Sequence, residues 1–382
     1  MDAPSQLGIR KIHSVEFVVD FFDRSRTFYL EKMGFVETHR STPSWEEQFK
    51  SKAVVFSSHG IRILVTAPLS THSYTAQYLK LLCPGIRNVT FLVKDLDKTV
   101  SYLREHHGTF IHPEVKVESP HSSHRFVTIA TSIGFVEFTF LEIEGDAADI
   151  PMFEKLECPD TNGASFMAID HLTINARTLF PIWQFFEHVL DFKKFWNVAF
   201  HTPDYSSGKK GTGLSSQVMY DPGSGIKLAT NEPLYPHFNE SQIQRFVECN
   251  HGAGIQHIAL SVKDLVGTVR CLRERGVEFL HTPGAYYDLL PQRLAEKNVH
   301  AIDENLDDLR REGILVDGEN GNYLLQIFLQ DASMLYHEEN AGPFFYEIIQ
   351  RKGHPGFGEG NFRALFESIE ADQIRRGVID AG

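Results

Sequence analysis

The chain has 382 residues, 42% of them hydrophobic, and its 50 acidic and 37 basic side chains give a formal net charge of −13. The length favours two to three domains, the lack of a basic run argues against nucleic acid as a partner, and no apolar run approaches the roughly 18 residues of a membrane span. No basic-then-apolar signal pattern begins the chain, so we expect a cytoplasmic protein whose four scattered cysteines are reduced thiols.

The first half of the chain combines an amphipathic helix with several strands. A helix is predicted from Arg24 to Met33, and β-branched and aromatic runs predict strands at residues 15–19, 53–56, 61–65, 126–130 and 136–140. The stretch from Gly145 to Ser165 holds two prolines with small and acidic residues, which is typical of a linker between domains. We therefore expect two domains, residues 1–150 and 151–382.

The second half shows the same order of elements with an insertion. Strands are predicted at residues 217–220, 226–228, 255–262 and 323–328. The insertion runs from Tyr286 to Asp317, and in it Asp303 is expected to N-cap a short helix that stops at Gly313. The stretch from Pro203 to Ser216 is rich in Gly, Ser and Lys and is expected to be a mobile loop.

The two halves repeat each other. Residues 12–17 match residues 169–174, and the longer stretch 85–96 matches 254–265. The helix that follows the second match keeps its apolar stripe in both copies, and a glycine stands each time where its C-cap is expected: Leu96, Val100, Leu103 and Gly108, against Leu265, Val269, Leu272 and Gly276. A duplicated structural unit explains these matches.

The repeat is informative where its copies differ. His171 stands where the first copy has Ser14, and His257 stands where it has Asn88. Any one histidine is more often a satisfied imidazole than a ligand, but two that share equivalent strand positions and are missing from the sister copy indicate one metal site. Glu347 is a carboxylate inside an apolar run, where an unpaired charge is costly, so it is either a third ligand or the partner of a base such as Arg351.

Two imidazoles and one carboxylate on neighbouring strands form the ligand set of non-haem Fe(II) oxygenases. Three ligands on one side of an octahedral ion leave the other side open for a substrate and O₂. Zinc would prefer a tetrahedral site. The same ligand set also occurs with other divalent metals.

The second half carries blocks that resemble the 4-hydroxyphenylpyruvate dioxygenase family, part of the vicinal-oxygen-chelate superfamily. They occur in family order along the chain, as GIQHIAL at 254–260, LLQIF at 324–328, EIIQR at 347–351, GFGEGNF at 356–362 and LFESIE at 365–370. The resemblance implies an α+β fold of two tandem domains, each an open, antiparallel-rich, barrel-like sheet of paired βαβββ modules flanked by helices. It also implies a structural first domain without metal ligands, a catalytic second domain and a C-terminal lid helix.

The resemblance also implies roles for individual residues. His171, His257 and Glu347 match the family's Fe(II) ligands. Ser216, Asn231 and Gln242 match a polar network that is directed at the substrate ring. Gln326 matches a glutamine at the 2-oxo-acid end, and Phe357 and Phe362 match aromatic walls of the pocket. Gln256 and Phe345 are also expected to bind the substrate. Phe345 would share the strand face of Glu347 and line the site, whereas Gln256, next to a ligand, would point to the other face if the strand is regular.

The implied activity is the Fe(II)-dependent conversion of 4-hydroxyphenylpyruvate and O₂ to homogentisate and CO₂, a step of tyrosine catabolism, by a homo-oligomer. A hydroxymandelate synthase or another aryl-pyruvate dioxygenase would use the same site. One departure is that Ala229-Thr230 replaces the family's usual Pro-Ile before Asn231, which could loosen that strand. The same fold would also suit a glyoxalase-like isomerase, which would need a fourth ligand, or a metal-free binding module.

Overall fold

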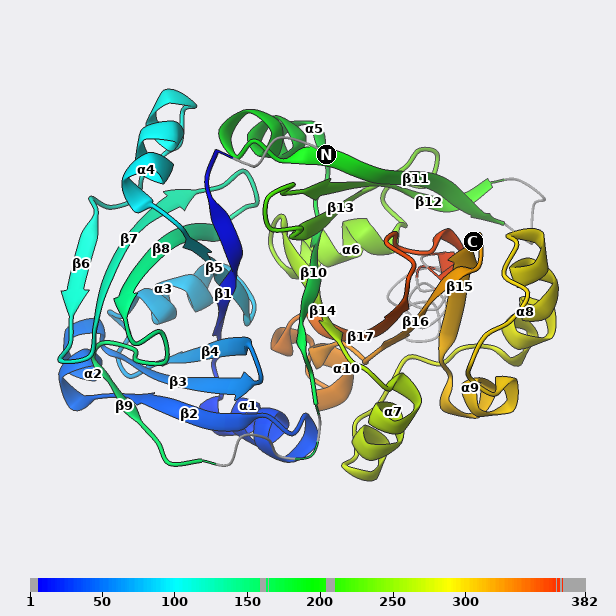
Figure 1. Cartoon of the computed structure of the whole chain (residues 1–382), viewed down its shortest axis with the longest axis horizontal. Helices are drawn as coiled ribbons and strands as arrows, with labels where there is room; N and C mark the ends of the chain where they lie inside the picture. The colour runs from blue at the N-terminus through cyan, green and yellow to red at the C-terminus, as the bar shows by residue number, and fades with distance from the viewer. Residues whose placement is uncertain are drawn as a thin grey trace.

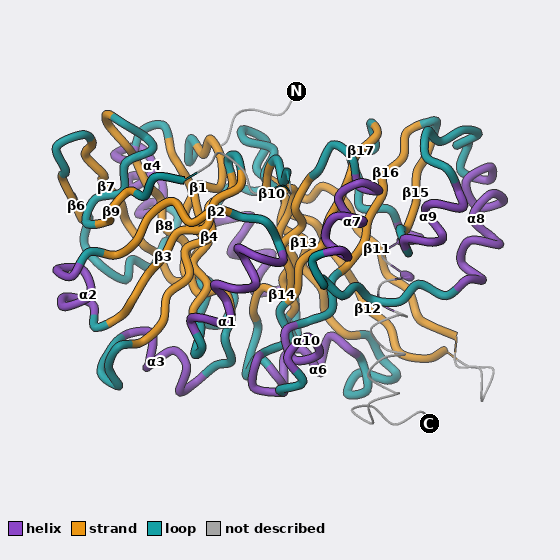
Figure 2. The backbone as a smooth tube through the Cα atoms, turned by 90° about the horizontal axis from the view of Figure 1, so that it is seen from below, coloured by secondary structure: helices purple, strands orange, loops and turns teal. Residues whose placement is uncertain are grey.

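Two strongly curled sheets, one from each half of the chain, make up the protein (Figures 1 and 2). The computed structural model describes residues 6–158, 163, 165–203, 210–361, 363, 364 and 366. Within these residues, strand order is β6-β7-β8-β5-β1-β4-β3-β2-β9 in the first sheet and β11-β12-β13-β10-β14-β17-β16-β15 in the second. Both sheets are mixed and flanked by helices, which confirms the predicted fold class.

The elements of the first half are β1 (Ile9–Val18), α1 (Phe22–Thr27), the π-helical η1 (Phe28–Lys32), β2 (Val36–Ser41), α2 (Pro43–Phe49), β3 (Ser51–Ser58), β4 (Ile61–Pro68), α3 (Tyr74–Leu81), β5 (Gly85–Val93), α4 (Leu96–Glu105), β6 (Val115–Glu118), β7 (Ser122–Ala130), β8 (Glu137–Gly145) and β9 (Phe153–Lys155).

The elements of the second half are β10 (Ala168–Asn175), α5 (Phe180–Gln184), the π-helical η2 (Phe185–Val189), β11 (Lys193–Pro203), β12 (Lys210–Tyr220), β13 (Lys227–Pro233), α6 (Gln242–Cys249), β14 (Gly254–Ser261), α7 (Leu265–Glu274), α8 (Gly284–Glu296), α9 (Leu306–Glu312), β15 (Leu315–Glu319), β16 (Asn322–Phe328), α10 (Ala332–Tyr336), the 3₁₀ turn η3 (Glu339–Ala341) and β17 (Phe345–Lys352).

Each sheet is built from two βαβββ modules that meet at its centre. The first strands of the two modules pair antiparallel, β1 with β5 and β10 with β14. Each of them also pairs in parallel with the last strand of its own module: β1 with β4, β5 with β8, β10 with β13, and β14 with β17. The repeat predicted from the sequence is therefore present as four copies of one module.

The repeated helices α4 and α7 begin in the same way. Asp95 and Asp264 are their N-caps and accept hydrogen bonds from backbone N–H groups of the first turn. The predicted apolar stripes are buried in both copies. The helix ends differ: Gly276 adopts the left-handed conformation after α7, whereas His107 does so after α4. Gly108 is instead required because a Cβ there would lie 2.9 Å from the Leu103 carbonyl oxygen, so its predicted C-cap role is wrong.

Five β-bulges distinguish the central strands from regular ones. One, at Arg10 on β1, occurs in the first sheet alone. The other four occupy equivalent positions in the two sheets, and the register with the partner strand skips one residue at each: His13 on β1, Arg87 on β5, Asp170 on β10 and Gln256 on β14. A bulge turns the extra residue and re-aims the side chains beside it. The same two bulges occur in both copies of the module pair, so they are a property of the repeated unit.

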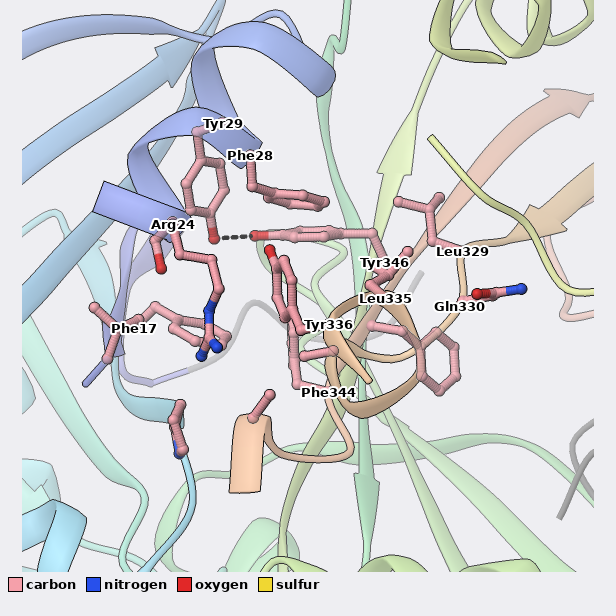
Figure 3. Close-up of a pocket in the computed structure, with 16 residues that line it drawn as sticks. Phe17, Arg24, Phe28, Tyr29, Leu329, Gln330, Leu335, Tyr336, Phe344 and Tyr346 are labelled. Atoms are coloured by element: carbon pink, nitrogen blue, oxygen red, sulfur yellow. Dashed lines mark hydrogen bonds between the residues drawn. The ribbon is translucent and has the colours of Figure 1, made fainter. Parts of the chain in front are cut away.

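The halves pack through a continuous apolar core that includes residues of both sheets. Tyr29 and Tyr346 join their hydroxyl groups at 2.9 Å, and Phe17 packs edge-on against Phe344 at a centroid distance of 4.9 Å. A cavity of about 50 Å³ lies at this seam, between η1 and the α10 region (Figure 3). Tyr346 directly precedes Glu347 on β17, so its side chain faces away from that of Glu347.

Several local predictions need correction. The predicted linker contains β9, which pairs with β2 at the edge of the first sheet; the domain boundary at residue 150 stays a prediction. The expected loop after Pro203 is in large part strand β12, while residues 204–209 lie outside the described part. The N-cap of α9 is Asn305 rather than Asp303, because the Asn305 side chain accepts from two backbone N–H groups; the helix does end at Gly313.

Two further expectations concern helices. A helix begins at Glu359, but most of the predicted C-terminal lid helix lies outside the described residues. None of the helices in the described part is both long and apolar enough to cross a membrane.

Candidate metal centre

Three buried side chains from three adjacent strands meet in the second sheet. His171 lies on β10, His257 on β14 and Glu347 on β17, and each is at most 2% exposed. Glu347 Oε2 is 3.3 Å from Nε2 of each histidine, and one ligand atom from each residue lies within 4.8 Å of the others. Ligands at about 2.1 Å from an ion and at right angles would be about 3.0 Å apart, so the cluster is close to ligating geometry.

The bulges fix which nitrogen of each histidine can bind a metal. Asp170 turns back so that its carboxylate accepts a hydrogen bond from His171 Nδ1 at 2.8 Å, and Gln256 Oε1 lies 3.3 Å from His257 Nδ1. Because both acceptors hold the proton on Nδ1, the Nε2 lone pairs point at Glu347. Two lone pairs facing a carboxylate repel it unless a cation lies between them, so this donor set fits a divalent metal.

The electrostatics of the cluster agree with this interpretation. Burial would raise the pKa of Glu347, but the two imidazoles outweigh it and hold that pKa at about 2. Burial lowers the pKa of His257, while for His171 the nearby carboxylates of Glu347 and Asp170 outweigh burial and raise its pKa. The carboxylate is therefore ionised at neutral pH, as a metal ligand must be.

Arg351 forms its ion pair with Asp170 and not with Glu347, so the interpretation of Glu347 as the partner of this base is wrong. The guanidinium donates from Nε and Nη2 to the two Asp170 oxygens, each at 2.7 Å. Burial would raise the Asp170 pKa, but these hydrogen bonds and that of His171 lower it far below its usual range.

Gln326 on β16 holds the other oxygen of Glu347. Its Nε2 donates to Glu347 Oε1 at 2.7 Å, which leaves Oε2 for the histidines. The amide of Asn361, at the start of the C-terminal helix, lies 2.9 Å from Gln326 Oε1 and 2.9 Å from the Tyr286 hydroxyl. Gln326 thus lies beside the cluster, and its role at the 2-oxo-acid end of a substrate stays a prediction.

A row of buried polar groups crosses the same sheet near the end of β10, beyond His171 in the chain direction. Asn175, Asn231 and Ser216 are aligned across β10, β13 and β12, and Asn231 Nδ2 donates to Asn175 Oδ1 at 3.0 Å. Asn175 Nδ2, Asn231 Oδ1, Ser216 Oγ and the Thr173 hydroxyl are all buried and, in the described part of the chain, without a protein hydrogen-bond partner. Buried polar atoms are normally satisfied, so this row is suited to the polar end of a ligand.

Gln242, at the start of α6, is joined to this site through Gln256. Its Oε1 accepts from Gln256 Nε2 at 3.4 Å, and both side chains are buried. Gln256 therefore does not point to the opposite face, as regular alternation would place it, because it is the bulge residue of β14.

Aromatic rings surround the histidines. Phe345 stacks on the His257 ring at a centroid distance of 4.8 Å, and Phe357 meets the His171 ring edge-on at 4.6 Å. Trp196 on β11 stacks on Phe357 at 5.7 Å. The predicted wall residue Phe362 lies outside the described residues.

The replacement of Pro-Ile by Ala229-Thr230 is well accommodated. Ala229 pairs on both sides of β13 and packs with Phe357 and Val218, and Thr230 Oγ1 donates to the Gln217 carbonyl at 2.7 Å. The strand that carries Asn231 is therefore held without the proline.

Sequence reasoning did not identify five residues of the site: Asp170, Thr173, Asn175, Trp196 and Asn361. Thr173 and Asn175 alternate with His171 on β10, so alternation could have shown that they face the same way. Asp170 follows from the bulge, which leaves no signal in the spacing of apolar residues.

Comparisons with known proteins show the family to which the chain belongs. A model of the Glyoxalase/Bleomycin resistance protein/Dioxygenase superfamily matches residues 11–127 and 168–290. The chain is 33% identical to the 4-hydroxyphenylpyruvate dioxygenase of Caenorhabditis briggsae over 95% of this chain and 92% of the relative. It is 35% identical to that of Pseudomonas aeruginosa over 91% and 89%.

The chain belongs to the 4-hydroxyphenylpyruvate dioxygenase family. The resemblance found in the sequence is thereby confirmed. The fold is also similar to the solved structure of a mutant 4-hydroxymandelate synthase from Streptomyces coelicolor, with a TM-score of 0.81 and 25% identity over 96% of this chain and 99% of that one. In this member of the 4-hydroxyphenylpyruvate dioxygenase family, three donors, two pre-set histidine tautomers and a row of unsatisfied polar atoms lie inside one curled sheet.

Proposed function

We propose that the chain is an Fe(II)-dependent dioxygenase that converts 4-hydroxyphenylpyruvate and O₂ to homogentisate and CO₂. The observation that carries this proposal is the buried cluster of His171, His257 and Glu347, with both Nε2 lone pairs directed at one carboxylate oxygen. Its support from outside the molecule is the series of relatives named 4-hydroxyphenylpyruvate dioxygenase.

Iron is the proposed metal because two imidazoles and one carboxylate, here His171, His257 and Glu347, are the ligand set of non-haem Fe(II) oxygenases. When bound, Fe(II) would supply the binding of the 2-oxo acid and of O₂ and the redox chemistry of oxidative decarboxylation. The chain's own contribution is to hold the metal and to place the substrate.

The side chains divide this second task between the two ends of the substrate. Gln326, with its amide beside Glu347, lies at the 2-oxo-acid end, and the row of Asn175, Asn231 and Ser216 lies where the phenol hydroxyl would need partners. A ligand anchored at both ends loses rotational freedom before reaction. Phe345 and Phe357 pack on the two histidines and exclude water from the metal.

A hydroxymandelate synthase remains the second candidate, because a structure of that enzyme shares this fold. Both reactions consume one O₂ and release one CO₂, so the two candidates differ only in the product. Homogentisate carries a methylene group on a trisubstituted ring, whereas hydroxymandelate carries a hydroxylated benzylic carbon on a para-substituted ring.

The test uses the purified chain stripped of metal and refilled with Fe(II) or with Zn(II). The Fe(II) form should consume O₂ with 4-hydroxyphenylpyruvate and the Zn(II) form should not, and NMR of the product should show homogentisate. Hydroxymandelate would favour the second candidate, and inert Fe(II) protein would refute both. Sedimentation would test the predicted homo-oligomer, and cell fractionation the predicted cytoplasmic location.

A further inference from the structure

One guanidinium connects the first metal-binding histidine to the loop that follows β17. Arg351 donates two hydrogen bonds to Asp170, and its Nη1 donates to the carbonyls of His354 at 2.9 Å and of Gly356 at 2.5 Å. The planar fork of arginine can make these bonds in one geometry, which a lysine ammonium cannot reproduce.

Both ends of this connection contact His171. At one end, Asp170 accepts a hydrogen bond from His171 Nδ1. On the other, Phe357 follows Gly356 in the loop and packs edge-on against the His171 ring, with the Arg351 guanidinium 5.8 Å from its centroid. The position of the loop and the orientation of the His171 imidazole therefore depend on the same three side chains, those of Asp170, Arg351 and Phe357.

A second cation holds the same loop. Lys227 Nζ donates to the Pro355 carbonyl at 2.7 Å and lies 6.0 Å from the centre of the Phe357 ring. Burial, followed by the nearby charge of Arg351, lowers the Lys227 pKa to about 8. Lys227 on β13 lies directly beside His171 on β10 in the pairing of these two strands. This second contact with the loop is therefore also made by a neighbour of His171.

The arrangement is specific to one ligand of one copy. His257 has only a neutral amide, Gln256, at 3.3 Å from its Nδ1. In the first sheet, where Ser14 replaces His171, the strand registers place His13 at the position of Asp170 and Ile143 at that of Arg351. Among these equivalent positions of the described strands, the charged pair thus occurs only beside His171.

We propose that Asp170 and Arg351 are positioning residues that couple metal binding at His171 to the observed position of the loop carrying Phe357. A carboxylate on the far nitrogen of a ligating histidine fixes its tautomer and raises its donor strength, and loss of such partners typically weakens metal binding about 10- to 100-fold. Through Arg351 the same carboxylate is attached to the loop, so each event favours the other.

The coupling is measured with Zn(II), which does not quench fluorescence, and without substrate. Trp196 reports the loop because its ring stacks on Phe357, and the other two tryptophans are replaced by phenylalanine. Zn(II) affinity is obtained by competition with a chromophoric chelator. Asp170→Asn and Arg351→Met should each weaken Zn(II) binding about 10- to 100-fold and should abolish the change in Trp196 emission that Zn(II) causes in the parent.

The double variant and a matched control separate coupling from general damage. If the two residues act as one unit, Asp170→Asn/Arg351→Met binds Zn(II) no more than about twofold more weakly than the weaker single variant. Arg351→Lys should not restore the emission change. Arg87→Met removes an arginine–carboxylate pair of similar exposure in the first sheet and should leave both readouts unchanged.

Three results would overturn the inference: Zn(II) affinity within twofold of the parent in Arg351→Met, a retained emission change in both single variants, or effects that multiply in the double variant. The inference rests on the proposed metal centre and not on the substrate. If Zn(II) binding is coupled to the loop but the Fe(II) protein has no turnover, the inference stands and the dioxygenase proposal fails. If the Fe(II) protein turns over but Zn(II) binding is not coupled to the loop, the dioxygenase proposal stands and the inference fails.

Discussion

At the scale of single residues, the site is defined by what its polar atoms lack. The histidine Nδ1 atoms have acceptors, whereas the Nε2 atoms face only Glu347, and four further buried atoms on β10, β12 and β13 lack protein partners within the described part of the chain. Leaving a buried polar atom unsatisfied costs about 1–3 kcal/mol. The free protein therefore carries the cost of a binding site, and a metal with its substrate would recover it.

Glu347→Gln should abolish turnover and weaken iron retention, because an amide keeps the shape of the carboxylate but loses its charge and much of its affinity for a divalent cation. Iron content after gel filtration and O₂ uptake measure the two effects. Thr139→Val is the control. The pairing of β5 with β8 places Thr139 at the position in the first sheet that corresponds to Glu347, so this variant should leave iron content and O₂ uptake unchanged. Full activity with bound iron in the glutamine variant would remove Glu347 from the metal.

Asn231→Ala should act on the phenol end of the substrate. Its unsatisfied Oδ1 is available to the ring hydroxyl, so kcat/KM for 4-hydroxyphenylpyruvate should fall about 10- to 100-fold, the equivalent of one buried hydrogen bond. The substrate analogue without the hydroxyl, phenylpyruvate, should be turned over equally by variant and parent. An equal loss with both substrates would show that Asn231 supports the strand instead.

At the scale of elements, the sequence revealed the repeated helices and strands but not the bulges. The apolar stripe of α7 and the strand before it are local patterns, and both are present. The bulges at Asp170 and Gln256 depend on how two distant strands pair, so the alternation rule placed Gln256 on the wrong face. β9 was missed for the same reason, because three residues in a polar stretch form a strand only beside the edge of β2.

The bulge at His13 makes stability depend on pH. Burial, followed by the charges of Arg62, His124 and Lys11, lowers the His13 pKa to about 3, whereas the unfolded chain titrates near 6.5. Between these values the unfolded state binds more protons, so stability is full above pH 6.5 and is lost as the pH falls towards 3. His13→Asn should reduce the slope of unfolding free energy against pH by up to about 1.4 kcal/mol per unit between pH 4 and 6.

Urea unfolding at several pH values measures this slope. Substitution of the exposed His300 by Asn is the control and should leave the slope as it is in the parent. An unchanged slope in His13→Asn would mean that the neighbouring buried imidazoles, His39 and His124, account for the whole acid dependence.

At the scale of the whole molecule, the first sheet has the same architecture as the second. At positions that correspond to the proposed metal ligands, it carries side chains that hydrogen-bond to each other. Asn88 Nδ2 donates to Thr139 Oγ1 at 2.8 Å where the second sheet has His257 and Glu347. This loss could be predicted from the sequence, because Ser14 and Asn88 replace histidines. The contact between the halves could not, since Tyr29 and Tyr346 are 317 positions apart and the repeat does not show which residues of one half face the other.

That contact should make the two halves unfold together. The Tyr29 and Tyr346 hydroxyls are buried against each other, and Tyr346 is the residue before Glu347 on β17. Tyr29→Phe should destabilise the protein by about 1–3 kcal/mol because it leaves the Tyr346 hydroxyl buried without its partner. Tyr29→Phe/Tyr346→Phe should recover part of that loss, since replacing both partners by apolar groups is nearly neutral. Urea unfolding followed by far-UV circular dichroism and by tryptophan fluorescence gives both quantities. Coincident transitions indicate one cooperative unit, and two separate transitions would show that the halves unfold independently. Additive losses in the double variant would show that the two hydroxyl groups do not stabilise each other.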